Sequence, residues 1–342
     1  MGKRRLRTLF YGTSHEHAPG KLDALRKLTD DFEVIAVVDD SRRGTPTYRN
    51  DPLDTSGFRV VSEEEGRKID DIDVAFVETA NGDLMEVAEL FADRGIPMHC
   101  DKPCGESLEP YARILAKCKS GNIPFQIGYM YRANPAVRFC WKAVREGLLG
   151  DVSFVEADMN HAYGDDSYQR YTEAFRGGLM YNLGCHLVDM VEPLVKGDLL
   201  RATPVVAAAA GDPKTCRNRC VSLLEFAEST VVLRSCSRAP GGIPCRRLRI
   251  DGSNGTIDLC PIERFDGVEL TLALTLREAR GGHPAGISTV GFGVQSDRYA
   301  PQLAELAAIV RGDRANDQDY DRDLRVHRMT LMACGPDGIS DP

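Results

Sequence analysis

Short apolar runs alternate with helix-patterned segments over the first 130 residues, and this alternation constrains the fold more than any other feature of the chain. The runs are almost wholly apolar and rich in β-branched residues, which is typical of parallel strands covered by helices on both faces. We therefore expect a doubly wound, Rossmann-type α/β domain over residues 1–130, an architecture that binds nucleotides. Its expected strands cover residues 6–11, 32–38, 73–77, 96–100 and 124–130, and its expected helices cover residues 22–28, 84–94 and 108–119.

The pattern changes beyond about residue 150, where strand-like runs follow one another directly. Turn sequences such as Gly241-Gly242 and Gly252–Gly255 separate them, which predicts a largely antiparallel sheet. We expect a second, α+β domain over residues 131–342, whose C-terminal helices can pack back on the first domain. Its expected strands cover residues 152–159, 205–210, 220–226, 230–236, 247–251 and 268–276, and its expected helices cover residues 178–195 and the segments that begin at Pro301 and Asp321.

Composition and charge exclude several classes of protein. With 42% hydrophobic and 27% charged residues the chain is typical of globular proteins, and its net charge of −8 argues against a nucleic-acid partner. The basic N-terminus, Met1–Arg7, precedes no apolar signal segment, and no run approaches the ~18 apolar residues of a membrane span. The 11 cysteines form no Cys-x-x-Cys pair, which favours reduced thiols in a cytoplasmic protein over a disulfide framework or structural zinc.

The first expected strand ends in the turn Gly12–Gly20, where a doubly wound sheet binds its ligand. Gly12 is kept as the tight-turn residue, but Ser14 and His17 replace the second and third glycines of Gly-x-Gly-x-x-Gly. Backbone N–H groups at the helix end can still hold a pyrophosphate, with the hydroxyls of Thr13 and Ser14 as further donors. A polar turn that binds nothing is the alternative. The residues of this turn expected to contact a cofactor are Gly12, Thr13, Ser14, His15 and His17.

The second expected strand ends in Asp39 and Asp40. An acidic side chain here can accept hydrogen bonds from the ribose hydroxyls of a dinucleotide and repels a 2′-phosphate, so we expect NAD. Asp39 is the first candidate, and Asp40 can share its role. Arg42 or Arg43, just past the strand, can instead receive a 2′-phosphate, which leaves NADP as the less favoured cofactor.

Cys100-Asp101-Lys102-Pro103 follows the fifth expected strand and supplies the first catalytic candidate. Asp101 and Lys102 are also expected to contact the cofactor. At this end of the strand Lys102 points into the crevice where a nicotinamide lies. There an ammonium can hydrogen-bond a substrate hydroxyl and stabilise its oxygen as hydride leaves the carbon. We hypothesise a cis peptide bond before Pro103. A solvated loop lysine is the alternative interpretation.

The second catalytic candidate lies in a segment that we expect to be helical from Gly178. Asn182, His186 and Asp189 then fall at i, i+4 and i+7 on one face of the helix. A lone buried histidine is more often structural, but its polar neighbours favour a functional role. An imidazole of pKa ~6.5 is the natural general base for the proton of a carbinol, which makes His186 the expected acid/base.

These motifs resemble those of the Gfo/Idh/MocA (glucose–fructose oxidoreductase, inositol dehydrogenase and rhizopine catabolism) family. Asp101-Lys102-Pro103 matches the family's Glu-Lys-Pro, Gly128–Arg132 precedes Asn134-Pro135, and Gly177-Gly178 leads to Gly184-x-His186-x-x-Asp189. The resemblance implies a nicotinamide cofactor and a reaction at a secondary hydroxyl of a sugar, inositol or glycoside. It also implies an open C-terminal sheet, often used in dimers or tetramers, with Lys102 orienting the substrate hydroxyl and His186 as acid/base. The expected substrate-binding residues from these motifs are Asn182, Asp189, Tyr129 and Arg132.

The chain departs from the family at two places. Thr13–His17 replaces the glycine-rich turn, which puts the affinity and exchange of the cofactor in question. Asn182 stands where the family commonly has Asp. An amide can position a hydroxyl but cannot share a proton, so His186 is expected to act without a carboxylate from that position.

The loop Asn160–Asp166 follows an expected strand and precedes the catalytic segment. Functional side chains often lie on such loops, and we count His161 and Tyr163 among the substrate-binding candidates. His15 and His17, with His161 and His186, offer imidazole ligands, but His-x-His spacing is a weak signal. We therefore expect no metal.

Three classes of function stay open at this point. The first is a reversible NAD-dependent dehydrogenase of a sugar, inositol or glycoside. The second is an enzyme with tightly bound NAD that oxidises C3 of a glycoside transiently and so achieves cleavage or epimerisation. The third is a non-catalytic sugar or nucleotide sensor, because fold alone does not establish function. Retention of both Lys102 and His186 argues against the sensor.

Overall fold

The computed structural model describes residues 3–48, 52–163 and 166–335, which form two compact units. The first unit contains the chain up to Met130 together with Tyr299–Arg325, and the second contains Tyr131–Arg298 and the chain from Val326. The C-terminal helices are thus divided between the units. Positions of the sequence analysis that lie outside the described residues are Met1, Gly2, Gly164 and Asp165.

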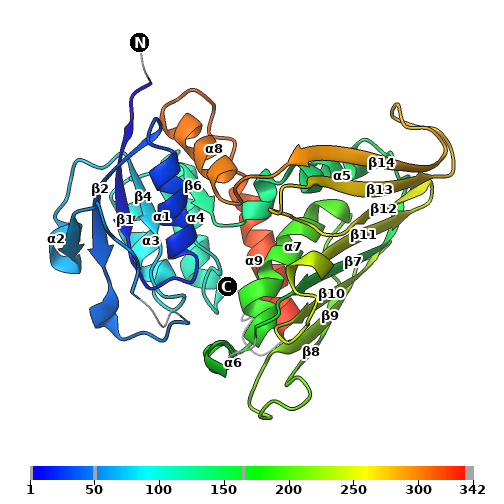
Figure 1. The fold of residues 1–342 in the computed structure, drawn as a ribbon, viewed down its shortest axis with the longest axis horizontal. Helices are drawn as coiled ribbons and strands as arrows, with labels where there is room; N and C mark the ends of the chain where they lie inside the picture. The colour runs from blue at the N-terminus through cyan, green and yellow to red at the C-terminus, as the bar shows by residue number, and fades with distance from the viewer. Residues whose placement is uncertain (1–2, 49–51, 164–165, 336–342) are drawn as a thin grey trace. The chain divides into compact units, whose positions relative to one another are not determined.

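A six-stranded parallel sheet forms the first unit and confirms the predicted doubly wound fold. The strand order is β3-β2-β1-β4-β5-β6, so winding reverses between β1 and β4, and ligands of such sheets bind at this point. All residues of β4 are buried, and helix α1 crosses one face of the sheet (Figure 1), which explains the continuous apolar runs. The strands are β1 (Leu6–Tyr11), β2 (Phe32–Asp39), β3 (Val60–Ser62), β4 (Val74–Val77), β5 (Met98–Cys100) and β6 (Phe125–Ile127). The helices are α1 (Ala18–Lys27), α2 (Glu63–Arg67), α3 (Leu84–Asp93), α4 (Leu108–Ser120) and α8 (Ala300–Val310).

The second unit contains an eight-stranded sheet in the order β14-β13-β12-β11-β7-β10-β9-β8, which confirms the predicted, mostly antiparallel sheet. Among its described strands only β7 and β10 pair in parallel. Buried and more exposed residues alternate along β9 and β13, as expected for a sheet with one covered face. The strands are β7 (Val152–Asn160), β8 (Arg201–Ala207), β9 (Arg219–Glu225), β10 (Thr230–Cys236), β11 (Arg247–Gly252), β12 (Gly255–Leu259), β13 (Glu269–Leu276) and β14 (Gly286–Val294). The helices are α5 (Pro135–Arg145), α6 (Asp166–Glu173), α7 (Cys185–Val191) and α9 (Tyr320–Cys334), the last divided between the units.

Six elements lie where the sequence analysis predicted none: β3, α2, α5, α6, β12 and β14. The start of helix α5 carries a sequence signal, Asn134 followed by Pro135 in the first turn. In the structure the side chain of Asn134 caps the helix by accepting hydrogen bonds from the N–H groups of Ala136 and Val137. Strand β14 had no such signal. It is an edge strand that contains three glycines and no fully buried residue, so it lacks an apolar pattern.

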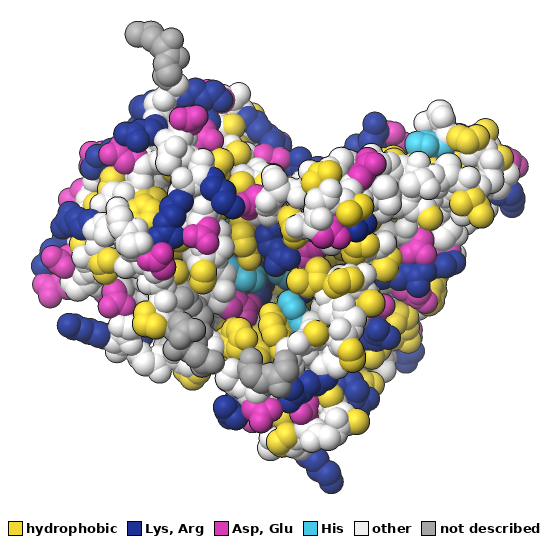
Figure 2. All heavy atoms as spheres, in the orientation of Figure 1, with side chains coloured by type: hydrophobic (Ala, Val, Ile, Leu, Met, Phe, Trp, Pro, Cys, Tyr) yellow, Lys and Arg dark blue, Asp and Glu magenta, His cyan; other side chains and the backbone are white. Residues whose placement is uncertain are grey.

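The surface carries mixed charge. Basic and acidic side chains are interspersed over the face that Figure 2 shows. Three of the exposed large apolar side chains, Val205, Ile287 and Val294, lie on β8 and β14, the two edges of the eight-stranded sheet. No helix of the described chain is both long and apolar enough to cross a membrane.

Substitution of Gly178 tests how tightly the start of the segment that contains His186 packs against Arg217. Gly178 has φ +52°, and a Cβ atom there would lie 2.2 Å from Cβ and 2.3 Å from the carbonyl oxygen of Arg217. Gly197 has φ +79° and no neighbouring atom within 4 Å of the same position. We expect Gly178→Ala to lower the free energy of unfolding by about 3 kcal/mol, from overpacking plus backbone strain. Gly197→Ala carries the strain alone and should cost about 1 kcal/mol. Equal losses in urea unfolding followed by circular dichroism would contradict this packing.

Candidate active site

The turn after β1 requires glycine at its first residue. Gly12 has φ +105°, and a Cβ atom there would lie 2.4 Å from the backbone nitrogen of Thr79 and 2.5 Å from the carbonyl carbon of Glu78. The backbone after β4 therefore passes directly against the turn, and no larger residue fits without displacement. Gly12 is the tight-turn residue that the sequence predicts, at the point where the winding of the sheet reverses.

Asp40 closes this turn from the end of β2. Its Oδ1 accepts hydrogen bonds from the backbone N–H of Thr13 at 2.7 Å and from the hydroxyls of Thr13 and Ser14 at 3.0 and 2.8 Å. The hydroxyls that we assigned to a pyrophosphate are thus bound to Asp40 in this structure, because a buried carboxylate needs donors. Its Oδ2 is buried and has no hydrogen-bond partner among the described residues, so one acceptor remains for a ligand.

The other candidates beyond β2 have different environments. Asp39 is half-buried and accepts a hydrogen bond from the N–H of Ser41 at 2.9 Å. The side chain of Arg42 is exposed. Arg43 donates to Glu63 at 2.7 Å and to Glu86 at 3.2 Å. The buried acidic position is therefore that of Asp40, and Arg43 is held in ion pairs.

His15 is buried beneath the turn as a neutral ring. Its Nδ1 accepts from the N–H of His17 at 3.0 Å, so its Nε2 carries the hydrogen and donates to the carbonyl oxygen of Lys102 at 3.0 Å. Burial lowers the pKa of His15 to about 4, although Asp101 opposes the shift. The ring therefore joins the turn after β1 to the loop after β5 without carrying charge at neutral pH.

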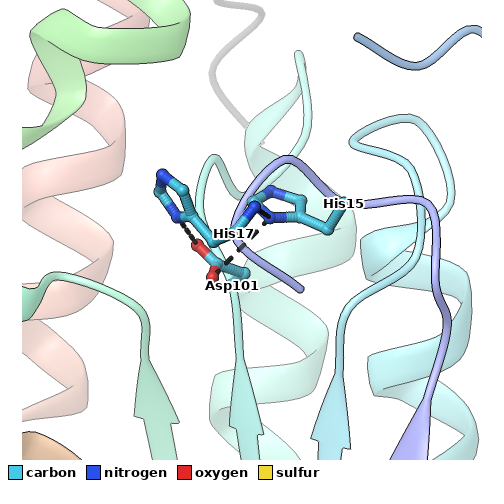
Figure 3. Close-up of side chains that lie close together, drawn as sticks. All are labelled: His15, His17 and Asp101. Atoms are coloured by element: carbon cyan, nitrogen blue, oxygen red, sulfur yellow. Dashed lines mark hydrogen bonds and ion pairs between the residues drawn. The ribbon is translucent and has the colours of Figure 1, made fainter. Parts of the chain in front are cut away.

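Asp101 lies at the centre of a buried polar cluster, and Figure 3 shows the rings of His15 and His17 facing its carboxylate. Its Oδ1 accepts from the N–H of Lys102 at 2.7 Å and interacts with Nδ1 of His17 at 3.0 Å. Its Oδ2 lies 3.3 Å from the ammonium of Lys21, a fully buried residue of α1. Burial alone raises the pKa of Asp101, but Lys21 and then the two histidines hold it well below its usual value. Asp101 is therefore the ionised centre of the cluster.

Glu78 and His99 complete the cluster on the side of β4 and β5. Glu78 lies beside two ring nitrogens, Nδ1 of His15 at 3.6 Å and Nε2 of His99 at 4.0 Å. Burial, reinforced by the charge of Asp101, raises the pKa of Glu78 well above its usual value. Burial and Lys21 lower the pKa of His99 to about 3, and its Nδ1 lies 2.9 Å from Oε1 of Gln126. Burial therefore favours the neutral form of Glu78, and His99 is neutral.

The predicted catalytic lysine has a carboxylate partner. Lys102 is fully buried, and its ammonium donates to Oε1 of Glu16 at 2.8 Å. Burial raises the pKa of Glu16, but Lys102 first, then His17 and His15, lower it to about 2. This ion pair holds Lys102 against the turn that follows β1.

Four residues of the cluster were missed from the sequence: Glu16, Lys21, Glu78 and His99. Glu78 had a signal, because it directly follows an apolar strand and so lies at the ligand-binding edge of the sheet. Glu16 lies inside the altered turn itself. No sequence signal marked Lys21 or His99, because Lys21 lies within helix α1 and His99 lies within strand β5.

The cluster contains donor atoms that a metal ion can use. One nitrogen or oxygen each from His15, His17 and Asp101 lie within 4.8 Å of one another, as do those of Glu78, His99 and Asp101. However, the ammonium of Lys21 already lies beside Asp101, and the N–H of His17 occupies Nδ1 of His15. These contacts favour a network of charges and hydrogen bonds over a metal centre. The other two candidate ligands, His161 and His186, belong to the second unit.

The helical segment of the second unit begins at Gly178, as predicted. Met180–Gly184 forms a π-helical turn (η3) within it, and α7 follows from Cys185. At its start, Gly178 has a positive φ, and the N–H of Leu179 donates to the carbonyl of Arg217 at 2.8 Å. The wider turn changes the angle between side chains, so simple i, i+4 spacing does not apply.

The three polar residues of this segment are all buried, and each has its own environment. Asn182 donates to the hydroxyl of Tyr168 at 3.0 Å. The ring of His186 lies edge-on to Tyr131, with 5.5 Å between centroids. Asp189 accepts two hydrogen bonds from Arg132, at 2.8 and 2.6 Å. The motif residues Arg132 and Asp189 are thus paired within the second unit.

The predicted substrate loop forms an aromatic stack beside this segment. The rings of His161 and Tyr163 stack at 4.3 Å, and Tyr163 lies 4.2 Å from Tyr168, the partner of Asn182. The buried guanidinium of Arg246 lies 2.8 Å from Nε2 of His161 and also donates to Glu263 at 2.6 Å. The structure therefore brings His161 and Tyr163 together with Asn182, whereas Tyr129 is buried in the first unit.

Comparison with known proteins agrees with these observations. A sequence model of the GFO/IDH/MocA C-terminal domain matches residues 137–258. D-apiose dehydrogenase of Paraburkholderia graminis is 24% identical over 269 residues, which cover 75% of this chain and 67% of that protein. The rhizopine catabolism protein MocA of Rhizobium meliloti is 25% identical over 250 residues, covering 69% of this chain and 76% of that protein. The chain is therefore similar in sequence to proteins of the Gfo/Idh/MocA family, and residues 137–258 match that family's C-terminal domain.

A solved structure of similar fold is that of aldose–aldose oxidoreductase from Caulobacter crescentus complexed with glycerol. It is 20% identical, has a TM-score of 0.73 and covers 95% of each chain. In this chain the Lys102–Pro103 peptide bond is cis, as hypothesised from the sequence. The family motif around Gly128–Arg132 is divided between the two units after Met130.

The neutral state of His15 predicts a dependence of stability on pH. Between about 4 and the ordinary pKa of 6.5 the unfolded chain binds a proton at this residue and the folded chain does not. The free energy of unfolding should therefore fall as the pH drops from 6.5 towards 4. Urea unfolding at several pH values should give a shallower fall for His15→Gln than for the control His283→Gln, a half-buried residue outside the cluster. Identical slopes would show that His15 is not buried neutral.

Proposed function

We propose that this protein is an NAD-dependent dehydrogenase that transfers a hydride between a nicotinamide cofactor and a secondary hydroxyl of a sugar, inositol or glycoside. The observation that carries the proposal is the buried Lys102, held by Glu16 after β5 beside the turn at which the sheet reverses. Relatives whose names describe dehydrogenation or oxidoreduction of aldoses support the substrate class.

The residues of the first turn fit a dinucleotide. Gly12 leaves the turn without a side chain at its closest approach to the backbone after β4. Oδ2 of Asp40 is a buried acceptor for a ribose hydroxyl, and its charge disfavours a 2′-phosphate. Arg43, which could otherwise attract that phosphate, is paired with Glu63 and Glu86. These observations support NAD over NADP.

The chain's own residues supply binding and proton transfer, while a bound nicotinamide supplies the redox chemistry. Lys102 hydrogen-bonds the reacting hydroxyl and stabilises negative charge on its oxygen. His186 exchanges the hydroxyl proton, and Asn182 orients the substrate through hydrogen bonds without taking a proton. Stacked aromatic rings such as Tyr163 and His161 offer the flat apolar faces against which sugar rings pack.

Substitutions at the end of β2 test the cofactor site. We expect Asp40→Asn to weaken NAD binding about tenfold, because an amide is a poorer acceptor than a carboxylate for a ribose hydroxyl. Asp39→Asn should change the affinity by less than about threefold, since the carboxylate of Asp39 is bound to its own loop. Isothermal titration with NAD and NADP measures both, after the supernatant of denatured protein has been assayed for retained nucleotide. Failure of the native protein to bind or retain either nucleotide would refute the proposed function.

Removal of the two catalytic candidates tests the chemistry. Lys102→Ala and His186→Ala should each lower turnover by about 10²-fold or more, because each removes a group that stabilises charge or moves a proton at the reacting oxygen. Circular dichroism should show that both variants remain folded. Product analysis over a panel of sugars, inositols and glycosides gives the rates. Near-native rates in both variants would contradict the proposed roles.

A further inference from the structure

Glu78 is a fully buried acidic residue that directly follows β4, the strand beside the point where the winding of the sheet reverses. Its backbone lies against the turn after β1, since the N–H of His15 donates to the carbonyl oxygen of Glu78 at 3.0 Å. Ligands of doubly wound sheets bind at this edge. The carboxyl group of Glu78 therefore lies beneath the expected ligand site and out of contact with water.

Glu78 shares its surroundings with a second buried carboxyl group, that of Asp101. One oxygen of each lies within 4.8 Å of the other, and the two side chains are within hydrogen-bonding reach. Two ionised carboxylates repel each other in such a pair, whereas a protonated carboxyl donates a hydrogen bond to its ionised neighbour. Among the described residues no donor bonds either oxygen of Glu78. Because Lys21 lies 3.3 Å from Asp101, Asp101 carries the charge and Glu78 the proton.

The other titratable groups around Glu78 come from the turn after β1, from β5 with the loop that follows it, and from α1. They are His15, His99, Cys100, Lys102 and Lys21. Burial lowers the pKa of these two histidines and raises that of the thiol, so the three groups are neutral at pH 7. Burial likewise lowers the pKa of the more exposed His17. The cations that face Glu78 are therefore the two lysines.

The ionised groups of the cluster compensate one another. The ammonium of Lys21 lies 3.3 Å from Asp101. The ammonium of Lys102 lies 2.8 Å from Glu16. These two ion pairs leave the cluster without net charge as long as Glu78 keeps its proton. A further positive charge beside the cluster has no counterion in this arrangement, and ionisation of Glu78 supplies one.

We infer that Glu78 distinguishes oxidised from reduced nicotinamide: it gives up its proton when NAD⁺ binds and keeps it when NADH binds. The inference rests on the proposed dehydrogenase function. The two cofactors have the same adenosine and phosphate groups and differ in the positive charge of the nicotinamide ring. Hydride transfer requires this ring to meet the hydroxyl that Lys102 binds, and Lys102 directly follows Asp101, the partner of Glu78.

The proton changes balance over one oxidation. The C–H bond of the alcohol breaks with its electron pair going to the nicotinamide, and the O–H electron pair forms the C=O bond. The hydroxyl proton goes to His186, as proposed above, and takes no part in the exchange at Glu78. Hydride transfer removes the positive charge of the ring, and a proton from water returns to the carboxylate of Glu78. The net charge of the buried site is thus the same with either form of the cofactor.

The pH dependence of the two affinities tests the inference. Binding that releases a proton tightens as the pH rises, by up to about tenfold for each pH unit. Groups common to both cofactors cancel in the ratio of the dissociation constants of NAD⁺ and NADH. We expect this ratio to fall about tenfold or more between pH 6 and pH 9 in the native protein. Isothermal titration measures both constants.

Glu78→Gln removes the titration but matches the protonated carboxyl in size and charge. The variant should bind NADH with the native affinity and NAD⁺ about tenfold more weakly at pH 9, so that its ratio no longer changes with pH. A structural role of Glu78 would instead weaken both cofactors equally. The matched control is Glu109→Gln, which removes an exposed carboxylate that pairs with Arg113 on α4 and should leave the native pH dependence unchanged.

Proton release is a second readout, and it needs no variant. Titration in two buffers of different ionisation enthalpy counts the protons exchanged. We expect NAD⁺ to release a proton at pH 7 and NADH to release almost none. The infrared carbonyl band of the protonated, buried carboxyl should be lost when NAD⁺ binds and should persist with NADH. If Glu78→Gln fails to fold, absence of both signals in the native protein overturns the inference.

Failure of the inference differs from failure of the proposed function. A native protein that binds both nucleotides and oxidises a sugar, but with a ratio of affinities that is constant with pH, would overturn the inference alone. A ratio that still changes with pH in Glu78→Gln would also overturn it, because another group then titrates. Equal weakening of NAD⁺ and NADH in this variant has the same meaning. A native protein that binds neither nucleotide would remove both the inference and the function.

Discussion

The polar arrangement of the first unit depends on how the buried carboxylate of Asp101 is neutralised. A charge taken out of water is stable only with an opposite charge and hydrogen bonds around it. Lys21 supplies the charge at 3.3 Å, and the N–H of Lys102 and the ring of His17 supply hydrogen bonds. Because Lys21 belongs to α1 and Lys102 to the loop after β5, these contacts fix the first helix, the turn before it and the catalytic candidate in one geometry. Removing one partner of such a buried pair typically costs about 3–5 kcal/mol.

The unusual turn after β1 follows from the same requirement. Its polar side chains stand where the family has glycines, and each has a partner: Ser14 donates to Asp40, His15 bridges to Lys102, and His17 contacts Asp101. Gly12 cannot be replaced, because the backbone after β4 occupies the space of a side chain. The turn is therefore a polar structure that side-chain hydrogen bonds hold in place.

The site was predictable where local sequence carries the information. Lys102 and Asp101 follow an apolar strand, and strand ends of a parallel sheet meet at one edge. The partners of these residues were less accessible to sequence reasoning. Lys21 and His99 contact each other across 78 positions of the chain, and Glu16 and Lys102 across 86. In the second unit, helical spacing placed Asn182 and His186 on one face, but a π-helical turn at Met180–Gly184 changed the angle between them.

The sequence by itself determined the two architectures and the candidate catalytic residues. Apolar periodicity reflects burial along one element, and motif spacing reflects strand ends, so both can be read without contacts between distant residues. Tertiary structure alone decided that Asp40 rather than Asp39 is buried, that His15 is neutral and that Glu16 holds Lys102. The physical reason is that charge state and hydrogen-bond partners depend on solvent exclusion and on neighbours brought together by the fold, and a single position in the chain specifies neither.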